Sequence, residues 1–224
     1  MTEVKLHSFV KRVAAQQFEN CFNPYADRCP VHDFIDAPAK RAKTLSRLVE
    51  RAEASEVDAI WIGRDLGYRG GRRTGLALTD DIHIAEHLAR WGLTAKRPTV
   101  GEAVAERTAA VIWQMLSQMQ SNVFLWNVFP LHPHEPGNPF SNRQHNAAER
   151  RFGEDALAAL IELLNPKRIV CIGNDAYNSL GRLRGSIPTI AVRHPSYGGQ
   201  TQFVAQISEL YEIEPQSRNQ RALF

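Results

Sequence analysis

The chain has 224 residues, of which 43% are hydrophobic, so it is long enough to enclose a sizeable core in one α/β domain. A net charge of +3 and an isoelectric point of about 8.9 are mildly basic, which suits a polyanionic partner without requiring one. No apolar run approaches the roughly 20 residues of a membrane span, and the N-terminus lacks the apolar segment of a signal peptide, so we expect a soluble, cytoplasmic monomer with no membrane partner, nucleoid-associated if bacterial.

Hydrophobic periodicity divides the chain into alternating helices and strands. It predicts helices over residues 4–20, 37–54, 80–91, 99–119, 143–164 and 201–212, a short helix after 174, and strands over 57–62, 123–129, 168–172 and 189–192. Residues 21–37 and 130–142 are expected to form loops, and 214–224 a loose tail. Thr79 is expected to cap the helix over 80–91, with two acids in its first turn.

The four predicted strands are continuously apolar and are separated by helices. This pattern is typical of a parallel sheet covered on both faces, so we predict a three-layer α/β/α sandwich with a central four-stranded parallel sheet. Residues 1–224 are treated as a single domain, with 1–54 as an N-terminal helical extension packed on it.

Polar residues follow the strands where each one ends. The first strand delivers Gly63, Arg64 and Asp65 into a loop rich in glycine and arginine, the second ends near Asn127, and the last runs into His194. Because ligands of such sheets bind beyond the carboxyl ends of the strands, we expect these side chains to form one site.

The residue types favour chemistry on a base attached to a sugar. Asp65 can orient a water molecule and stabilise positive charge on a sugar, although it can equally cap a turn or pair with an arginine. His194 can donate to an oxyanion on a leaving base, or can be an ordinary loop histidine. Asn127 can read the donor and acceptor edge of a pyrimidine, or can make a structural hydrogen bond.

Together these segments resemble the uracil-DNA glycosylase superfamily over roughly residues 55–210. Gly63-Arg64-Asp65-Leu66-Gly67 lies where that superfamily has its first motif, Gly-Gln-Asp-Pro-Tyr-His in one branch and Gly-Glu-Ala-Pro-Gly in another. Residues 71–79, Gly-Arg-Arg-Thr-Gly-Leu-Ala-Leu-Thr, are similar to the Arg-Thr-Gly-x-x-Phe-Thr continuation of some branches. His194-Pro195-Ser196 matches the His-Pro-Ser of the second motif.

The resemblance implies a role for each matching residue. Asp65 would activate water and stabilise the sugar cation, His194 would stabilise the uracilate leaving group, and Asn127 would read uracil beside Gly63 and Arg64. The DNA backbone would be held by Arg72, Arg73 and Ser196, and Tyr197 would wedge into the stack that the flipped nucleotide leaves. The resemblance implies no metal or redox cofactor.

The chain also departs from the family pattern. Leu66-Gly67 replaces Pro-Tyr after the acid, and Leu78 stands where other branches stack a Phe on the base, which leaves Tyr68 as a candidate stacking partner. Arg64 replaces Gln or Glu and places a cation beside Asp65. The four cysteines of the cluster-containing branches are absent, so we expect an outlying member without an iron–sulfur cluster.

The sequence therefore predicts a monofunctional DNA glycosylase that flips uracil out of DNA and hydrolyses its N-glycosidic bond. Two alternatives fit the same residues. One is a module of the same fold that binds uracil or abasic DNA with poor turnover, and the other is an α/β enzyme that acts on free nucleotides or nucleosides.

Overall fold

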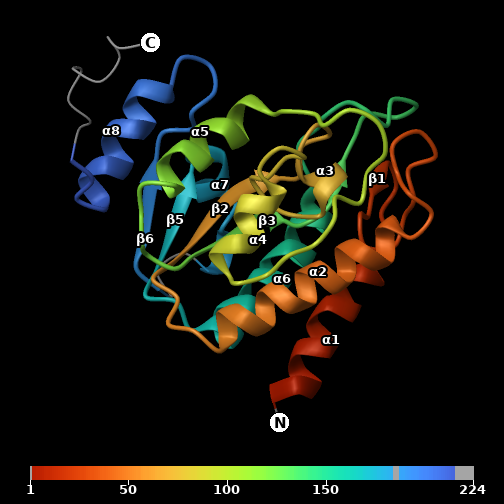
Figure 1. Ribbon diagram of the computed structural model, residues 1–224, viewed down its shortest axis with the longest axis horizontal. Coiled ribbons are helices and arrows are strands. Elements are labelled where there is room, and N and C mark those ends of the chain that lie inside the picture. Colours follow the sequence, from red (N-terminus) through yellow and green to blue (C-terminus); the bar gives the residue numbers. More distant parts are fainter. Residues whose placement is uncertain (1, 184–186, 215–224) are drawn as a thin grey trace.

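A four-stranded parallel sheet forms the middle layer of the protein, in the order β3-β2-β5-β6. The computed structural model describes residues 2–183 and 187–214. The strands are β1 (Cys21–Phe22), β2 (Ala59–Asp65), β3 (Val123–Phe129), β4 (His132–Pro133), β5 (Arg168–Ile172) and β6 (Thr189–Val192). The helices are α1 (Thr2–Ala14), α2 (Ala37–Glu53), α3 (Gly71–Thr74), α4 (Ile84–Arg90), α5 (Arg107–Leu116), α6 (Ala147–Leu164), α7 (Asn174–Asn178) and α8 (Gln200–Leu210), with a 3-10 turn at Gly181–Leu183 (Figure 1).

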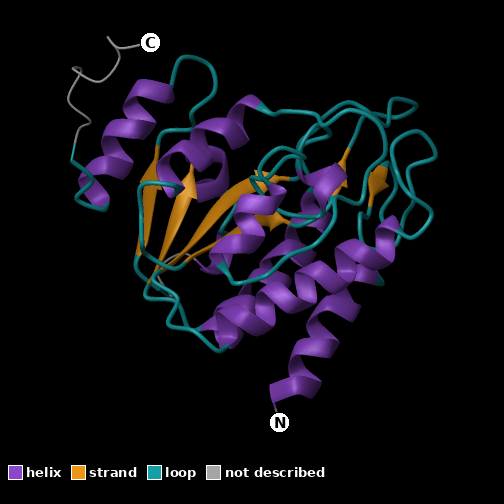
Figure 2. Ribbon diagram, viewed as in Figure 1, coloured by secondary structure: helices purple, strands orange, loops and turns teal. Residues whose placement is uncertain are grey.

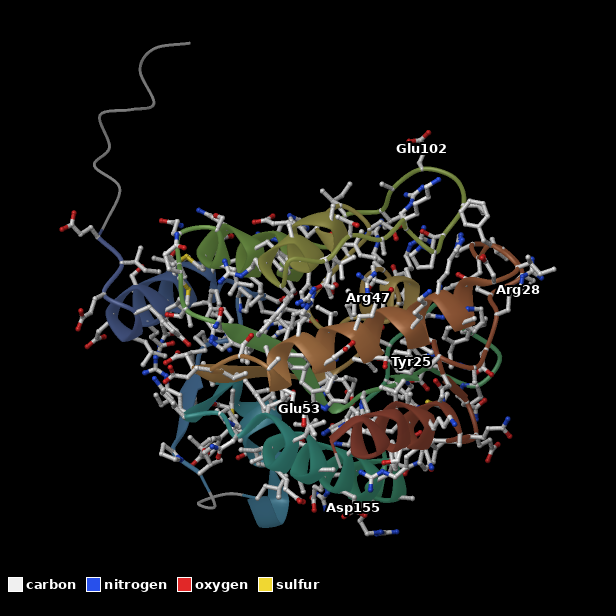
Figure 3. All side chains as sticks on the ribbon, turned by 60° about the horizontal axis from the view of Figure 1, so that its bottom comes forward. Tyr25, Arg28, Arg47, Glu53, Glu102 and Asp155 are labelled. Carbon is white, nitrogen blue, oxygen red and sulfur yellow. The ribbon has the colours of Figure 1, made fainter. Side chains whose placement is uncertain are left out.

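Side chains alternate between the two faces of the sheet, and each face has its own helices. On β2, Ile60 and Ile62 belong to a core shared with α1, α2, α4 and α6, whereas Ala59 and Trp61 belong to a core shared with α5 and α8. Figure 2 shows the sheet between these helices, and Figure 3 shows α1, α2 and α6 together on one side, where the three helices contact one another. The predicted three-layer sandwich with a central four-stranded parallel sheet is therefore confirmed.

The strand order places the reversal of the chain between β2 and β5. The chain passes from β2 outward to β3, returns across the sheet through α6, and continues from β5 outward to β6. Because the connections leave β2 and β5 in opposite directions, the carboxyl ends of these two strands flank the crevice where parallel α/β sheets bind ligands.

Several expectations about local structure were wrong, among them the helices expected over 4–20 and 99–119, which span Thr2–Ala14 and Arg107–Leu116. Residues 21–22 and 132–133 pair as the antiparallel strands β1 and β4, although both segments were expected to be loops. The helix expected over 80–91 begins only at Ile84, because Asp80 accepts hydrogen bonds from two backbone N–H groups of a turn, those of Ile82 and His83. Thr79 therefore does not cap it.

Helix α6 also begins later than the sequence suggests, at residue 147 instead of 143. Asn146 is its N-cap, and Glu149 completes a capping box by accepting from the Asn146 backbone N–H at 2.7 Å. Arg143 binds both carboxylate oxygens of Glu149 at 2.7 Å, so the segment before α6 is anchored to its first turn.

No helix among residues 2–183 and 187–214 is both long and apolar enough to cross a membrane. The expected loose tail, 214–224, lies outside the described residues except for Glu214.

Candidate active site

The centre of the site is a close approach of β2 and β3. Gly63 and Asn127 are register partners on the two strands, and a Cβ added at Gly63 would lie 2.5 Å from Asn127 Oδ1. Asn127 is only 2% exposed, yet its Oδ1 has no hydrogen-bond partner in the part of the chain that the structure describes. A buried acceptor without a partner is energetically unfavourable, so this amide oxygen is suited to receive a donor from a bound ligand.

Asp65 stands at the end of β2, two residues beyond Gly63, and both of its carboxylate oxygens are held. Oδ2 accepts from Arg64 Nε at 2.6 Å, and Oδ1 contacts Nδ1 of His145. Arg64 in turn donates from Nη1 to Asp175 Oδ2 in α7 at 2.8 Å. The carboxylate is 7% exposed, so it lies at the edge of solvent with fixed neighbours.

His194 follows β6 and lies against the loop that ends β5. A Cβ added at Gly173 would be 2.9 Å from the His194 Cβ, so the glycine leaves room for the histidine. The Ser196 backbone N–H donates to Nδ1 of His194 at 3.1 Å. Burial, with the nearby charges of Arg193 and Arg64, lowers the pKa of His194. A neutral ring that accepts at Nδ1 carries its proton on Nε2, so His194 can act as a neutral hydrogen-bond donor.

The turn after His194 presents one aromatic side chain to solvent. Tyr197 is 98% exposed and has a left-handed backbone with φ of 52°, while Ser196 Oγ lies 3.1 Å from Thr108 Oγ1 in α5. The turn is thus tied to α5 at Ser196 and projects Tyr197 outward.

Arg72 and Arg73 do not face solvent. Arg73 is 4% exposed and donates to Asp81 at 2.7 Å, and Arg72 is 3% exposed with its guanidinium 4.0 Å from the Phe22 ring centroid and 4.9 Å from that of Phe140. Both arginines therefore hold residues 66–75, the Gly/Arg loop that follows β2, against the protein, and we do not assign them to phosphate binding.

Leu78 and Tyr68 are the two side chains predicted to contact the base, and the structure gives them different surroundings. Leu78 has a left-handed φ of 53°, and its Cδ2 would be 3.1 Å from a Cβ at Gly63, which places it beside the Gly63 and Asn127 pair. Tyr68 is held through its backbone N–H, which donates to Asn142 Oδ1 at 3.0 Å. Leu78 is thus the one that lines the site.

Two neighbours of this site, His145 and Asp175, were not predicted from the sequence. His145 reaches Asp65 from the residue before the α6 N-cap, and Asp175 reaches Arg64 from α7. Asp175 could have been found, since it follows the predicted strand 168–172 at the expected edge of the sheet. His145 lies in a segment with no periodic pattern that would have singled it out.

Within residues 2–183 and 187–214, no three His, Cys, Asp or Glu side chains come together in a way that could hold a metal ion. No metal ligands are therefore assigned here.

Comparisons with known proteins bear on the family and the fold of the chain. The family model of the uracil DNA glycosylase superfamily matches residues 53–212. The crystal structure of wild-type SMUG2 from Pedobacter heparinus superposes with a TM-score of 0.64, covering 93% of this chain and 96% of the other at 13% sequence identity, a likeness of fold. A search of curated proteins gave no match. Because the family model matches well over half of its length, the chain belongs to the uracil DNA glycosylase superfamily.

Proposed function

We propose that the protein is a monofunctional DNA glycosylase that removes uracil from DNA by hydrolysing the bond between the base and its deoxyribose. The observation that carries the proposal is Asn127, a buried amide whose Oδ1 lacks a hydrogen-bond partner among the described residues and faces Gly63 near the end of the neighbouring strand. Uracil offers a donor at N3 beside an acceptor at O4, and one amide can satisfy both, with its oxygen on N3–H and its nitrogen on O4.

His194 and Asp65 would serve the two halves of the reaction. As the glycosidic bond breaks, its electron pair leaves with uracil and negative charge develops on the base, which a neutral His194 can stabilise through its Nε2–H. Positive charge develops on the sugar, where the Asp65 carboxylate can stabilise it, and water then attacks C1′ and gives up a proton. The products are free uracil and an abasic site.

A base inside a duplex must leave the helix before these groups can reach it. Unstacking costs a few kcal/mol, which binding of the backbone and insertion of a side chain into the vacated stack offset. Tyr197, almost fully exposed on a turn fixed at Ser196, is the side chain suited to that insertion. Ser196 retains hydrogen-bonding capacity for a phosphate beside its contact with Thr108.

The test is single-turnover incubation with an end-labelled oligonucleotide that carries one uracil, followed by alkali to cleave abasic sites. Wild type should cut at the uracil, and Asp65→Asn, His194→Ala and Asn127→Ala should each release the base at least about 100-fold more slowly. An identical oligonucleotide with thymine in place of uracil is the substrate control.

Three outcomes separate the alternatives. Cleavage that persists in Asp65→Asn and His194→Ala would contradict the assigned roles. Binding of the oligonucleotide without cleavage would favour the module with poor turnover. Absence of both would favour an enzyme of free nucleotides, which should also lack the steep loss of DNA affinity that added salt causes in a phosphate-binding protein.

A further inference from the structure

The proposed acid has a histidine partner that the motifs of the sequence do not include. Nδ1 of His145 contacts Oδ1 of Asp65, the oxygen that Arg64 does not bind. The His145 side chain is 2% exposed and that of Asp65 is 7% exposed, so the contact is shielded from water. An imidazole nitrogen facing a carboxylate oxygen donates to it, whether the ring is neutral or charged.

His145 is held from both sides by rigid structure. Its ring packs against Phe129, the last residue of β3, with ring centroids 6.1 Å apart. Its chain neighbour Asn146 is the N-cap of α6, fixed by the capping box with Glu149. The position of Nδ1 is therefore set by β3 and α6, while the carboxylate it contacts comes from β2.

Arg64, the other partner of the Asp65 carboxylate, explains why a fixed donor at His145 is needed. Arg64 is an adjacent residue with several N–H groups, and a guanidinium tends to bind a carboxylate through two parallel hydrogen bonds. In the structure Arg64 binds only one oxygen of Asp65 and uses Nη1 for Asp175. With Nδ1 of His145 on Oδ1, the carboxylate plane cannot turn to present both oxygens to Arg64.

We propose that His145 is a positioning residue for Asp65, which it keeps oriented toward the substrate and out of a bidentate pair with Arg64. This inference rests on the proposed function, because the orientation matters for the reaction assigned to Asp65. A misplacement of about 1 Å in such a group lowers a rate by about 100-fold.

The experiment compares His145→Ala with His145→Asn, whose side-chain amide nitrogen can occupy the place of Nδ1. Single-turnover release of uracil should slow by about 10- to 100-fold in His145→Ala, with the Kd for the oligonucleotide within about 3-fold of wild type. His145→Asn should recover to within about 5-fold of wild type. His134→Ala is the matched control and should keep full activity, because the His134 Nδ1 contacts the Glu135 carbonyl oxygen at 3.0 Å instead of Asp65.

Proton NMR of protein with ¹⁵N-labelled histidine gives a second readout without substrate. We expect a slowly exchanging Nδ1–H signal that disappears in His145→Ala and shifts in Asp65→Asn. A rate for His145→Ala within 2-fold of wild type, or His145→Asn no faster than His145→Ala, would overturn the inference. If wild type releases no uracil, the proposed function fails, and the NMR signal then decides alone: its presence supports the contact, and its absence overturns it.

Discussion

Glu106 gives the protein a predictable dependence of stability on pH. Its carboxyl packs against Gly67 and Gly70 of the Gly/Arg loop, where a Cβ at Gly70 would overlap Oε2. Burial, together with the charge of Asp80, raises the pKa of Glu106 to about 7, although Arg69 acts in the opposite direction. The folded protein therefore keeps this carboxyl protonated at pH values at which it is ionised in the unfolded chain.

The direction and size of this pH dependence follow from the difference in proton binding at Glu106 between the folded and unfolded states. Well below pH 4.5 both states hold the proton, and Glu106 contributes no pH dependence. As the pH rises from 4.5 toward 7, the unfolded chain releases the proton while the folded protein retains it, so the free energy of unfolding falls. At about 1.4 kcal/mol per unit, the full loss above pH 7 is about 3 kcal/mol.

Glu106→Gln removes the ionisation and keeps the shape of the side chain. The free energy of unfolding of this variant, relative to wild type, should increase by about 3 kcal/mol between pH 4 and pH 8. Urea denaturation followed by tryptophan fluorescence across that range measures it. Glu102→Gln, at an exposed position labelled in Figure 3, is the control and should show no such trend. A difference between Glu106→Gln and wild type that stays constant with pH would refute the reasoning.

Three further predictions concern the site and its support. Gly63→Ala should lower kcat/KM for uracil release by at least about 100-fold, because the new Cβ would lie 2.5 Å from Asn127 Oδ1 and would displace that oxygen. A rate near that of wild type would contradict the role of Asn127 in recognition of the base. Asp33→Asn should lower the free energy of unfolding by about 3–5 kcal/mol in urea, because it breaks a fully buried pair with Arg41; a loss below about 1 kcal/mol would contradict this. Tyr197→Ala should slow release from double-stranded DNA by more than from single-stranded DNA, since only the duplex must be unstacked, and equal effects would count against insertion.

A matched control is available for the buried pair. Asp36→Asn breaks the exposed pair with Lys40, whose side chains are 53% and 39% exposed, and should change stability by less than about 1 kcal/mol.

The sequence predicted those parts of the fold that follow from the pattern of apolar residues. The strands expected at 123–129, 168–172 and 189–192 have the bounds found in the structure, because each is a largely apolar segment between helices. The convergence of Gly63 and Asn127 was also predictable, since both lie near the carboxyl ends of parallel strands. Their assigned roles remain predictions.

Tertiary contacts decided the rest. A loop rich in glycine and arginine is typical of an anion site, but Arg72 instead stacks on Phe22 and Phe140, from segments far away in the chain. Phe22 belongs to a two-residue strand, which is too short to leave an alternating pattern. His145 could likewise not be identified from the sequence, because its proposed role depends on its contact with Asp65, which is 80 residues away in the chain.

The buried pair of Asp33 and Arg41 has a consequence for exchange of parts between related proteins. Arg41 Nε donates to the Arg73 carbonyl at 2.8 Å, and the hydroxyl of Tyr25, labelled in Figure 3, donates to the Gly75 carbonyl at 2.7 Å. The family model begins only at residue 53, so the residues that donate to the loop lie outside the segment that the model matches. A chimera that joined residues 53–212 to an N-terminal segment without donors equivalent to Arg41 and Tyr25 would leave the Arg73 and Gly75 carbonyls without hydrogen bonds. The first 52 residues and the Gly/Arg loop should therefore be inherited together, and a substitution in one should need a compensating change in the other.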